Sequence, residues 1–475
     1  MSIRKRFSVK DLLFQTCDGT IRANLMKTAL VIDDDAAFRR ETYRLLLGAG
    51  WRPLEAEEGE QGVAMAMQHQ PDLIICDLLV SRFNGFQLCR TIRAQRHRIR
   101  QPVIVVTSSS GYPTDRLNAL EVGADRYLVK PFKKETLLQL LQGEALYETE
   151  SIPKAGSPMP PPTTAPVSPS NHEPFIRFWG VRGSIPVPGP STVLMGGNTS
   201  CVEMRADGEI VILDAGSGIR RLGLALAREF KDQPVNVTIL ITHTHWDHIQ
   251  GFPFFIPAYN PKNKVRILGY EGARKGLLST LSSQMESPYF PVSMRQMPSN
   301  IEVKELREFE FPIGQLRVQA TFVNHPGLCL GYRIFTSAGS VAYLPDHESY
   351  QRMRSHSGNA SAEDQQELMK HTSAKDQKLV EFLRDVDALI IDSQYNDEEY
   401  KTRAGWGHGC VDDVVALALM ARARRLFLFH HDPDHDDAQI LKMLSWARDL
   451  VSSQNEGLIV DAACEGLQVS LKAAR

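Results

Sequence analysis

Short apolar runs alternate with amphipathic stretches over the first third of the chain. The runs lie at Leu30–Ile32, Trp51–Ala56 (the weakest, typical of an edge strand), Leu73–Cys76, Val103–Val106 and Tyr127–Val129. Short, bounded apolar runs are typical of strands that a parallel sheet buries on both faces. The stretches between them have the spacing of amphipathic helices. The alternation predicts a doubly wound α/β domain with its functional site at the carboxyl ends of the strands.

A proline-rich stretch separates this region from the rest of the chain. Residues 151–174 read SIPKAGSPMPPPTTAPVSPSNHEP, with eight prolines among 24 residues. Proline removes a backbone donor and excludes both a helix and a central strand, so this composition predicts a semi-rigid linker. We therefore expect an N-terminal tail over residues 1–25, a first domain over 26–146, a linker over 147–174 and a second domain over 175–475.

Strand-like runs come first after the linker, and helical patterns lie among them. The runs are Phe175–Trp179, Cys201–Arg205, Ile210–Asp214, Val237–Ile241, Val265–Leu268, Val318–Phe322, Gly331–Phe335, Ser340–Tyr343, Ala388–Ile391 and Leu426–Phe429. This order predicts a layered α/β/β/α architecture. Several histidines directly follow these runs, so we expect them to gather where the strands end.

Composition narrows the class of protein without naming a function. The formal net charge of the 475 residues is -2, which disfavours nucleic acid as a partner. No apolar run approaches 18 residues, so we expect no membrane-spanning helix. The seven cysteines are odd in number and show no C-x-x-C spacing, which is typical of reduced thiols and predicts a cytoplasmic protein.

Polar residues follow four of the predicted strands of the first domain. Asp33 and Asp34 follow the first, Asp77 the third, Thr107 the fourth and Lys130 the fifth. Strand ends converge in a doubly wound sheet, and three carboxylates together call for a divalent cation such as Mg²⁺. A carboxylate beside Mg²⁺ can act as a nucleophile toward a phosphoryl group.

Residues 26–146 resemble the response-regulator receiver domain. The resemblance rests on Leu-Val-Ile-Asp-Asp-Asp from Leu30, Asp77, Gly85, Thr107-Ser108, Tyr127 and Lys130-Pro131-Phe132; Val80-Ser81 departs from the Met-Pro that is common in the family. It implies a flavodoxin-like fold, and a sensor histidine kinase or phosphotransfer protein as partner. It also implies Asp77 as phosphoacceptor, Mg²⁺ bound by Asp33, Asp34 and the Leu79 carbonyl, and a conformational switch formed by Thr107, Tyr127 and Lys130.

The second domain contains the compact sequence His243-Thr244-His245-Trp246-Asp247-His248. Imidazoles and a carboxylate this close together suit Zn²⁺ and similar ions. Further candidate ligands follow later strand runs, namely His325, Asp346 and His430, with His431 as the alternative to His430. These residues would supply three ligands to each of two metals, with Asp346 as a bridge.

Residues 175–475 resemble the metallo-β-lactamase superfamily. The resemblance rests on Asn198-Thr199-Ser200-Cys201, on Asp214-Ala215-Gly216-Ser217-Gly218 and on H-x-H-x-D-H. It implies a four-layer αββα fold that holds two divalent metals, with zinc favoured and manganese or iron as alternatives. The implied ligands are His243, His245 and His325 for one metal, Asp247, His248 and His430 for the other, Asp346 as the bridge, and Asp214 as the support of a ligand histidine.

Two further segments are similar to the phosphodiesterase branch of that superfamily, namely Ile391-Asp392-Ser393-Gln394-Tyr395 and Gly405-Trp406-Gly407-His408-Gly409. The similarity implies that His408 reaches the scissile phosphate or the leaving oxygen, and that Asp392 supports it; with Asp247 these are the implied catalytic residues. Gly409-Cys410 departs from the hydroxyl residues usual there. A structural role for His408, as a helix-capping neighbour of Asp412, stays open.

The leading hypothesis is a response regulator whose output domain is a phosphodiesterase gated by phosphorylation at Asp77. A cyclic nucleotide or a small cyclic phosphate is the preferred substrate. A lactone or thioester hydrolase and a non-catalytic signalling scaffold are the alternatives, and a homodimer stays open. The polar insertion Ser349–Lys378 is expected to be either a lid over the metals or an exposed insertion.

Overall fold

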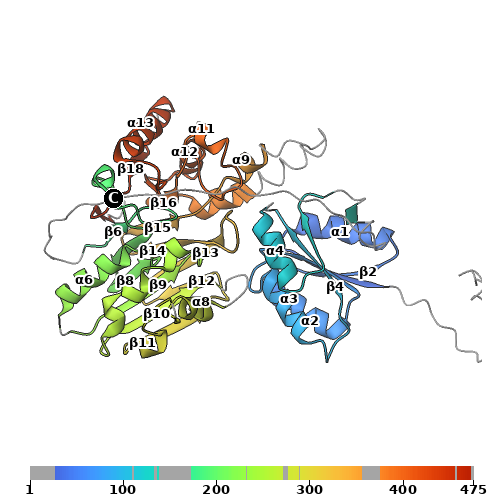
Figure 1. Cartoon of the computed structure of the whole chain (residues 1–475). Helices are drawn as coiled ribbons and strands as arrows, with labels where there is room; N and C mark the ends of the chain where they lie inside the picture. Colours follow the sequence, from blue (N-terminus) through green and yellow to red (C-terminus); the bar gives the residue numbers. More distant parts are fainter. Residues whose placement is uncertain are drawn as a thin grey trace, which may run out of the picture.

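A computed structural model of the chain describes residues 27–109, 112–132, 136–137, 173–231, 233–270, 276–287, 289–355, 375–454 and 457–471. The predicted tail (residues 1–25), nearly all of the predicted linker and the middle of the insertion lie outside these residues. Figure 1 shows an N-terminal domain in blue and cyan beside a larger C-terminal domain in green to red. In the described part of the chain, no helix is long and apolar enough to cross a membrane.

The N-terminal domain is a five-stranded parallel sheet in the order β2-β1-β3-β4-β5. This order is flavodoxin-like, with β2 at an edge, and it confirms the predicted doubly wound fold. The strands are β1 (Thr28–Ile32), β2 (Arg52–Ala56), β3 (Leu73–Asp77), β4 (Val103–Ser108) and β5 (Arg126–Val129). The described helices are α1 (Ala36–Gly48), α2 (Gly59–His69), α3 (Gly85–Ala94) and α4 (Pro113–Glu121).

Helix starts in this domain follow from local sequence. The Asp35 side chain accepts hydrogen bonds from the first turn of α1, and Asn84 forms a capping box with Gln87 at the start of α3. α4 begins after Tyr112 with Pro113 in its first turn, where the missing proline N–H has no helical partner to lose. These starts place α1, α3 and α4 at the carboxyl ends of β1, β3 and β4, around Asp33 and Asp77.

Two seven-stranded sheets form the centre of the C-terminal domain. One has the order β11-β10-β9-β8-β7-β6-β19, built from β6 (Phe175–Gly180), β7 (Cys201–Ala206), β8 (Glu209–Leu213), β9 (Asn236–Ile241), β10 (Lys264–Gly269), β11 (Asn300–Glu305) and β19 (Gln468–Ser470). The other runs in sequence order from β12 to β18: β12 (Glu310–Ile313), β13 (Leu316–Phe322), β14 (Leu330–Thr336), β15 (Gly339–Leu344), β16 (Ala388–Asp392), β17 (Arg425–Phe429) and β18 (Ile459–Ala462).

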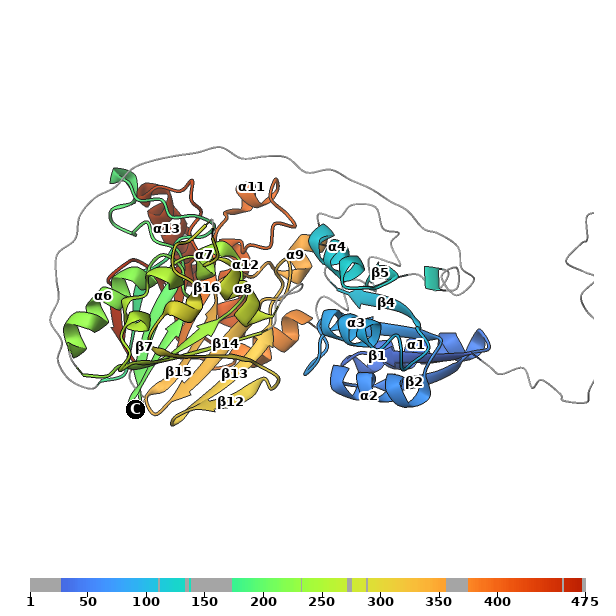
Figure 2. The same cartoon turned by 60° about the horizontal axis from the view of Figure 1, so that its bottom comes forward.

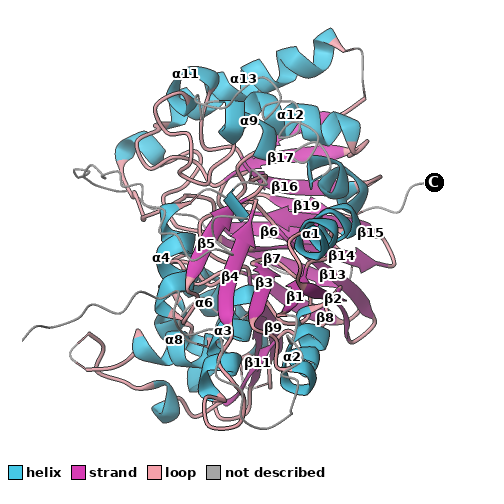
Figure 3. Ribbon diagram, turned by 90° about the vertical axis from the view of Figure 1, so that its right-hand side faces the viewer, coloured by secondary structure: helices cyan, strands magenta, loops and turns pink. Residues whose placement is uncertain are grey.

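Helices cover the outer faces of both sheets. Their bounds are α6 (Ile219–Phe230), α7 (Trp246–Ile249), α8 (Leu277–Ser283), α9 (Tyr350–Ser355), α11 (Asp397–Tyr400), α12 (Val411–Met420) and α13 (Asp437–Ser453), with short 3₁₀ turns η1 (Pro190–Thr192), η2 (Phe252–Phe254), η3 (Ile256–Tyr259) and η4 (Met294–Gln296). In Figure 3, α12 and α13 lie at one side of the strands, and α6 and α8 lie at the other.

Three buried apolar clusters hold these layers together. Between the sheets, Phe178 packs against Phe427 with ring centroids 5.2 Å apart. Leu222 of α6 belongs to the cluster that covers the first sheet, and Val414 of α12 to the cluster that covers the second. The predicted four-layer αββα fold is therefore confirmed.

The two domains touch at the end of the C-terminal domain where α9 begins. Figure 2 shows α4 of the N-terminal domain beside α9. The hydroxyl of Tyr112, the residue before α4, donates to Glu348, and Asp115 of α4 accepts from the Gly327 N–H. A third hydrogen bond joins Tyr270 to Gln87, and Lys378 pairs with Asp34. The described ends of the insertion Ser349–Lys378 thus lie against the other domain, which neither prediction for this segment included.

Candidate metal centre and phosphoacceptor site

The histidine-rich sequence follows directly from the buried strand β9. His243 and His245 lie in the turn after Ile241, and α7 then carries Asp247 and His248 into the interior. His245 stays exposed to solvent on one side, whereas the other three candidate ligands are buried. The chain therefore folds this short sequence around one point at the end of the sheet.

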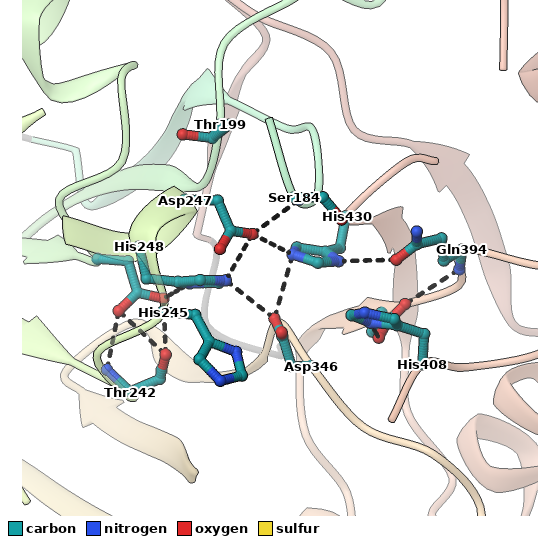
Figure 4. A network of polar contacts seen from close by, with 12 residues as sticks. Ser184, Thr199, Thr242, His245, Asp247, His248, Asp346, Gln394, His408 and His430 are labelled. Atoms are coloured by element: carbon teal, nitrogen blue, oxygen red, sulfur yellow. Dashed lines mark hydrogen bonds and ion pairs between the residues drawn. The ribbon is translucent and has the colours of Figure 1, made fainter. Parts of the chain in front are cut away.

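Asp346, which follows β15, lies between two groups of histidines, and Figure 4 shows it facing His248 and His430. Its Oδ2 is 3.5 Å from His243 Nε2 and 3.3 Å from His325 Nε2. Its Oδ1 is 3.1 Å from His248 Nε2 and 3.2 Å from His430 Nε2. One carboxylate thus faces each histidine group with a different oxygen, which is the arrangement of a bridging ligand.

The surrounding donor atoms suit divalent cations. The ligand atoms of His243, His245, His325 and Asp346 lie within 4.8 Å of one another, and so do those of Asp247, His248 and His430. Donors at about 2.0–2.1 Å from one tetrahedral ion lie about 3.4 Å apart, close to the spacings around Asp346. Three of these buried atoms have no hydrogen-bond partner among the described residues: His243 Nε2, His248 Nε2 and Asp346 Oδ1. Buried polar atoms without partners are rare, so the residues present fit a metal.

Hydrogen bonds fix the second nitrogen of three candidate histidine ligands. Asp214 Oδ2 lies 2.8 Å from His248 Nδ1, and the same carboxylate accepts from Thr242 and Tyr343. The Gly407 carbonyl lies 2.9 Å from His325 Nδ1, and Gln394 Oε1 lies 3.3 Å from His430 Nδ1. Such partners set the tautomer and the orientation of a ligand imidazole.

Most of the candidate ligands are in the protonation state that binds a cation, that is, neutral imidazole or ionised carboxylate. Burial lowers the pKa of His243 and His325 well below the usual value, so both rings are neutral. Burial alone would raise the pKa of Asp346, but the neighbouring histidines hold it well below the usual range. For His248 the effect of burial is outweighed by Asp247, Asp346 and Asp214, which raise the pKa. A cation therefore competes with a proton at His248.

His408 lies against this cluster and is held by a buried carboxylate. Its Nδ1 is 2.9 Å from Asp392 Oδ2, and its ring stacks on His430 with centroids 5.1 Å apart. Burial would lower the pKa of His408, but Asp392 and the other carboxylates raise it to about 9. The structure thus brings His408 against Asp392, whereas Asp412 contacts Cys410 and Trp446.

His431 points away from the cluster, and a backbone N–H from a distant loop contacts one of the candidate ligands. His431 directs Nε2 to the Ala463 carbonyl at 2.9 Å, whereas His430 Nε2 lies 3.1 Å from Asp247. The Ser184 backbone N–H, which sequence reasoning did not single out, donates to Asp247 at 2.8 Å. No local signal could have found it, since it comes from a distant loop.

The N-terminal domain gathers its predicted residues at the ends of β1, β3, β4 and β5. Lys130 pairs with Asp33, and its Nζ lies 2.6 Å from Asp77 Oδ1. Burial would raise the pKa of Asp77, but Lys130 and Lys375 lower it. The backbone N–H of Leu79 donates to Asp77, and the Tyr127 hydroxyl interacts with Ser108. Thr107 pairs with Asp77 across the strands, and its buried hydroxyl has no hydrogen-bond partner among the described residues.

Two family models match the chain. The response regulator receiver domain matches residues 29–142, and the beta-lactamase superfamily domain matches residues 210–362. The chain is a receiver domain joined to a beta-lactamase superfamily domain. Both predicted resemblances are thereby confirmed.

Individual relatives cover one domain at a time. The receiver domain is 36% identical over 130 residues to the DNA-binding regulator RpaA of Synechocystis, which covers 27% of this chain and 53% of RpaA. It is 34% identical to PilH of Pseudomonas aeruginosa, over 24% of this chain and 95% of PilH. The chain thus spans about half the length of RpaA. The crystal structure of the metallo-beta-lactamase fold protein YhfI from Bacillus subtilis aligns over 63% of this chain and 99% of that one, at 16% identity and a TM-score of 0.44.

Proposed function

We propose that the C-terminal domain is a dinuclear metal-dependent phosphodiesterase and the output of a response regulator. The observation that carries the proposal is Asp346, whose two oxygens face two separate groups of histidines beside the His408–Asp392 pair. A cyclic nucleotide or a small cyclic phosphate is the proposed substrate. The near-neutral charge of the chain supports a small substrate over a polyanion.

Each proposed ion has its own set of ligands. His243, His245 and His325 would hold one ion, Asp247, His248 and His430 would hold the other, and Asp346 would be shared. Two such ions, when bound, supply Lewis acidity that activates water and neutralises phosphate charge. Zinc suits the imidazole-rich donor set, and manganese and iron are the alternatives.

His408 is the proposed proton donor to the leaving oxygen. A departing alkoxide needs a proton, and an imidazolium beside the reacting group can supply it. Asp392 holds the Nδ1 side of the ring, which leaves Nε2 as the nitrogen available to the substrate. The positive charge that the carboxylates favour on His408 also suits an anionic phosphodiester better than a neutral lactone.

The receiver domain is proposed to gate this activity through phosphorylation of Asp77. A sensor histidine kinase or a phosphotransfer protein would supply the phosphoryl group. Lys130, beside Asp77, is positioned to pair with the added charge, and the unpartnered Thr107 hydroxyl offers a donor to it. The proposed Mg²⁺ ligands, Asp33 and Asp34, lie at the same strand ends.

Hydrolysis of bis(p-nitrophenyl) phosphate by the metal-loaded full chain tests the reaction, and a panel of cyclic nucleotides tests the substrate. We expect diester turnover that is lost in Asp346→Asn. Lactone turnover without diester turnover would contradict the proposal. Gating is tested by treating wild type and Asp77→Asn with a small phosphodonor; equal responses in the two proteins would reject it.

A further inference from the structure

Glu348 is a buried carboxylate at the junction of the two domains. It follows Asp346 by two residues, and its side chain has no exposed surface. Its Oε1 accepts from the Tyr400 hydroxyl and from the Gly405 N–H at 2.7 Å. Its Oε2 accepts from the Gly407 N–H at 2.8 Å and from the hydroxyl of Tyr112, in the receiver domain, at 2.9 Å. A buried carboxylate is costly unless donors satisfy it, so each of these bonds matters to the local structure.

The hydrogen bonds of Glu348 lead directly to candidate metal ligands. The Gly407 N–H donates to Glu348, while the Gly407 carbonyl lies 2.9 Å from His325 Nδ1. Gly407 has a φ of +90°, and a Cβ there would lie 2.6 Å from His325 Nδ1. A glycine is therefore required at this close approach. His408 is the next residue, so the same turn sets the place of the proposed proton donor.

The receiver domain contacts this arrangement at two points. Tyr112, which precedes α4, donates to Glu348, and Asp115 in the first turn of α4 accepts from the Gly327 N–H at 2.8 Å. Gly327 lies two residues after His325. Burial and the Glu348 carboxylate raise the pKa of the Tyr112 phenol well above its usual value, so the phenol keeps its proton and acts as the donor. The start of α4 thus contacts the loop after His325 through Asp115 and the segment before α9 through Tyr112.

We propose that Glu348 is a positioning residue for the metal centre and that Tyr112 of the receiver domain is one of its required donors. The catalytic part of this proposal rests on the function proposed above, whereas the effect of Glu348 on metal binding does not. Tyr112 follows β4, which carries Thr107 beside Asp77, by four residues. A shift of this segment removes a donor from Glu348, loosens the turn at Gly407, and so changes the placement of His325 and His408.

The test compares two tyrosine variants of the full chain. Tyr112→Phe removes the hydroxyl that reaches Glu348 and keeps the ring. Tyr270→Phe is the matched control, because it removes the 3.3 Å contact to Gln87 between the same two domains, away from the metal ligands. Zinc affinity is measured by competition with a chromogenic chelator. We expect Tyr112→Phe to bind its weaker zinc ion about tenfold less tightly, as for a lost hydrogen bond to a buried charge, and Tyr270→Phe to bind as wild type.

The diesterase kinetics of the same variant, compared with its zinc binding, separate this proposal from the proposed function. In the diesterase assay we expect Tyr112→Phe to lower kcat with little change in KM, since a misplaced His408 affects proton transfer in the transition state more than substrate binding. Weaker zinc binding in Tyr112→Phe, in a protein without diesterase activity, would sink the proposed function and leave the role of Glu348 standing.

Unchanged zinc affinity in the tyrosine variants would contradict the proposal. If Tyr112→Phe and Tyr270→Phe both bind zinc as wild type does, the role of Tyr112 is wrong, whatever substrate the enzyme hydrolyses. Glu348→Gln serves as a second variant, with an expected loss of zinc affinity larger than that of Tyr112→Phe. If that variant does not fold, the tyrosine pair still decides the matter.

Discussion

The two clusters of charged residues in this chain balance their charge in different ways. In the receiver site, Lys130 lies between Asp33 and Asp77 and pairs with both. In the beta-lactamase-fold domain, the carboxylate Asp346 is surrounded by imidazoles, and several of the facing atoms have no hydrogen bond. The buried Lys130 supplies its own positive charge, whereas the cluster around Asp346 combines His243 and His325, which burial keeps neutral, with His248, whose pKa its carboxylate neighbours raise.

We expect this difference to distinguish a tightly held cation site from an exchangeable one. In the receiver site Lys130 already pairs with Asp33 and Asp77, so we expect a cation there to exchange readily. In the histidine cluster, several buried donor atoms have no hydrogen-bond partner among the described residues, so we expect the cluster to hold cations through folding and turnover. The predictions below address this contrast, beginning with the largest expected effect.

Replacement of Asp346 by Asn removes the charge shared by both histidine groups. We expect diester hydrolysis to fall by at least about 10⁴-fold, because ion placement is worth several kcal/mol in such reactions. The assay is bis(p-nitrophenyl) phosphate turnover, with metal content measured on the same sample. Asp449→Asn, at an exposed carboxylate of α13, is the control and should match wild type. A fully active Asp346→Asn protein would remove the basis for a shared ligand.

Replacement of His408 by Ala removes the proposed proton donor and leaves the proposed ligands in place. We expect kcat to fall by about 10²–10³-fold, as for a lost general acid. Metal content should stay at the wild-type level, which distinguishes this variant from Asp346→Asn. His69→Ala, at the end of α2 in the receiver domain, controls for the loss of an imidazole. Loss of metal together with activity would instead make His408 a ligand.

Removal of cations should destabilise the two domains unequally. An ion present at about 100 times its Kd stabilises the folded state by about 2.7 kcal/mol, which chelation would remove from the beta-lactamase-fold domain. Mg²⁺ present near its Kd contributes only about 0.4 kcal/mol to the receiver domain. Calorimetry with a strong chelator, and separately with Mg²⁺ withheld, measures both. Equal losses of stability would contradict the contrast between the two sites.

Replacement of Asp214 by Asn keeps an oxygen toward Thr242 but removes the charge beside His248. We expect about tenfold weaker binding of one metal ion, in the range for the loss of a supporting carboxylate. Chelator competition measures it. An unchanged affinity would show that His248 does not depend on this carboxylate.

Much of the fold could be predicted because buried parallel strands leave a local signal. Runs such as Leu73–Cys76 are short and wholly apolar, and β3 is buried along its full length. The sequence also indicated which side chains would gather, because His243, Asp346 and His430 come within two residues of a strand end; that these residues bind metal stays a prediction. His430 and His431 could not be separated by sequence, since the choice depends on a left-handed backbone at His430, with a φ of 58°.

The contacts between distant loops could not be predicted. The Gly407 carbonyl that faces His325 lies 82 positions away in the sequence, and Tyr112 lies 236 positions from Glu348. The 405–409 motif gives no sign that the Gly407 carbonyl faces His325, because that contact depends on the packing of distant loops within one domain, whereas the Tyr112–Glu348 contact depends on the packing of the two domains. The same limit applies to the insertion Ser349–Lys378: the pairing of Lys378 with Asp34 of the receiver domain has no sequence signal, and the middle of the insertion lies outside the described residues.

The most direct test of the account is diester hydrolysis by metal-free full chain as zinc is added back in measured equivalents. The account predicts that the rate of bis(p-nitrophenyl) phosphate hydrolysis rises until two equivalents per chain are bound and then stays constant. A plateau at one equivalent would contradict a dinuclear centre. Full metal binding without diester hydrolysis would contradict the phosphodiesterase.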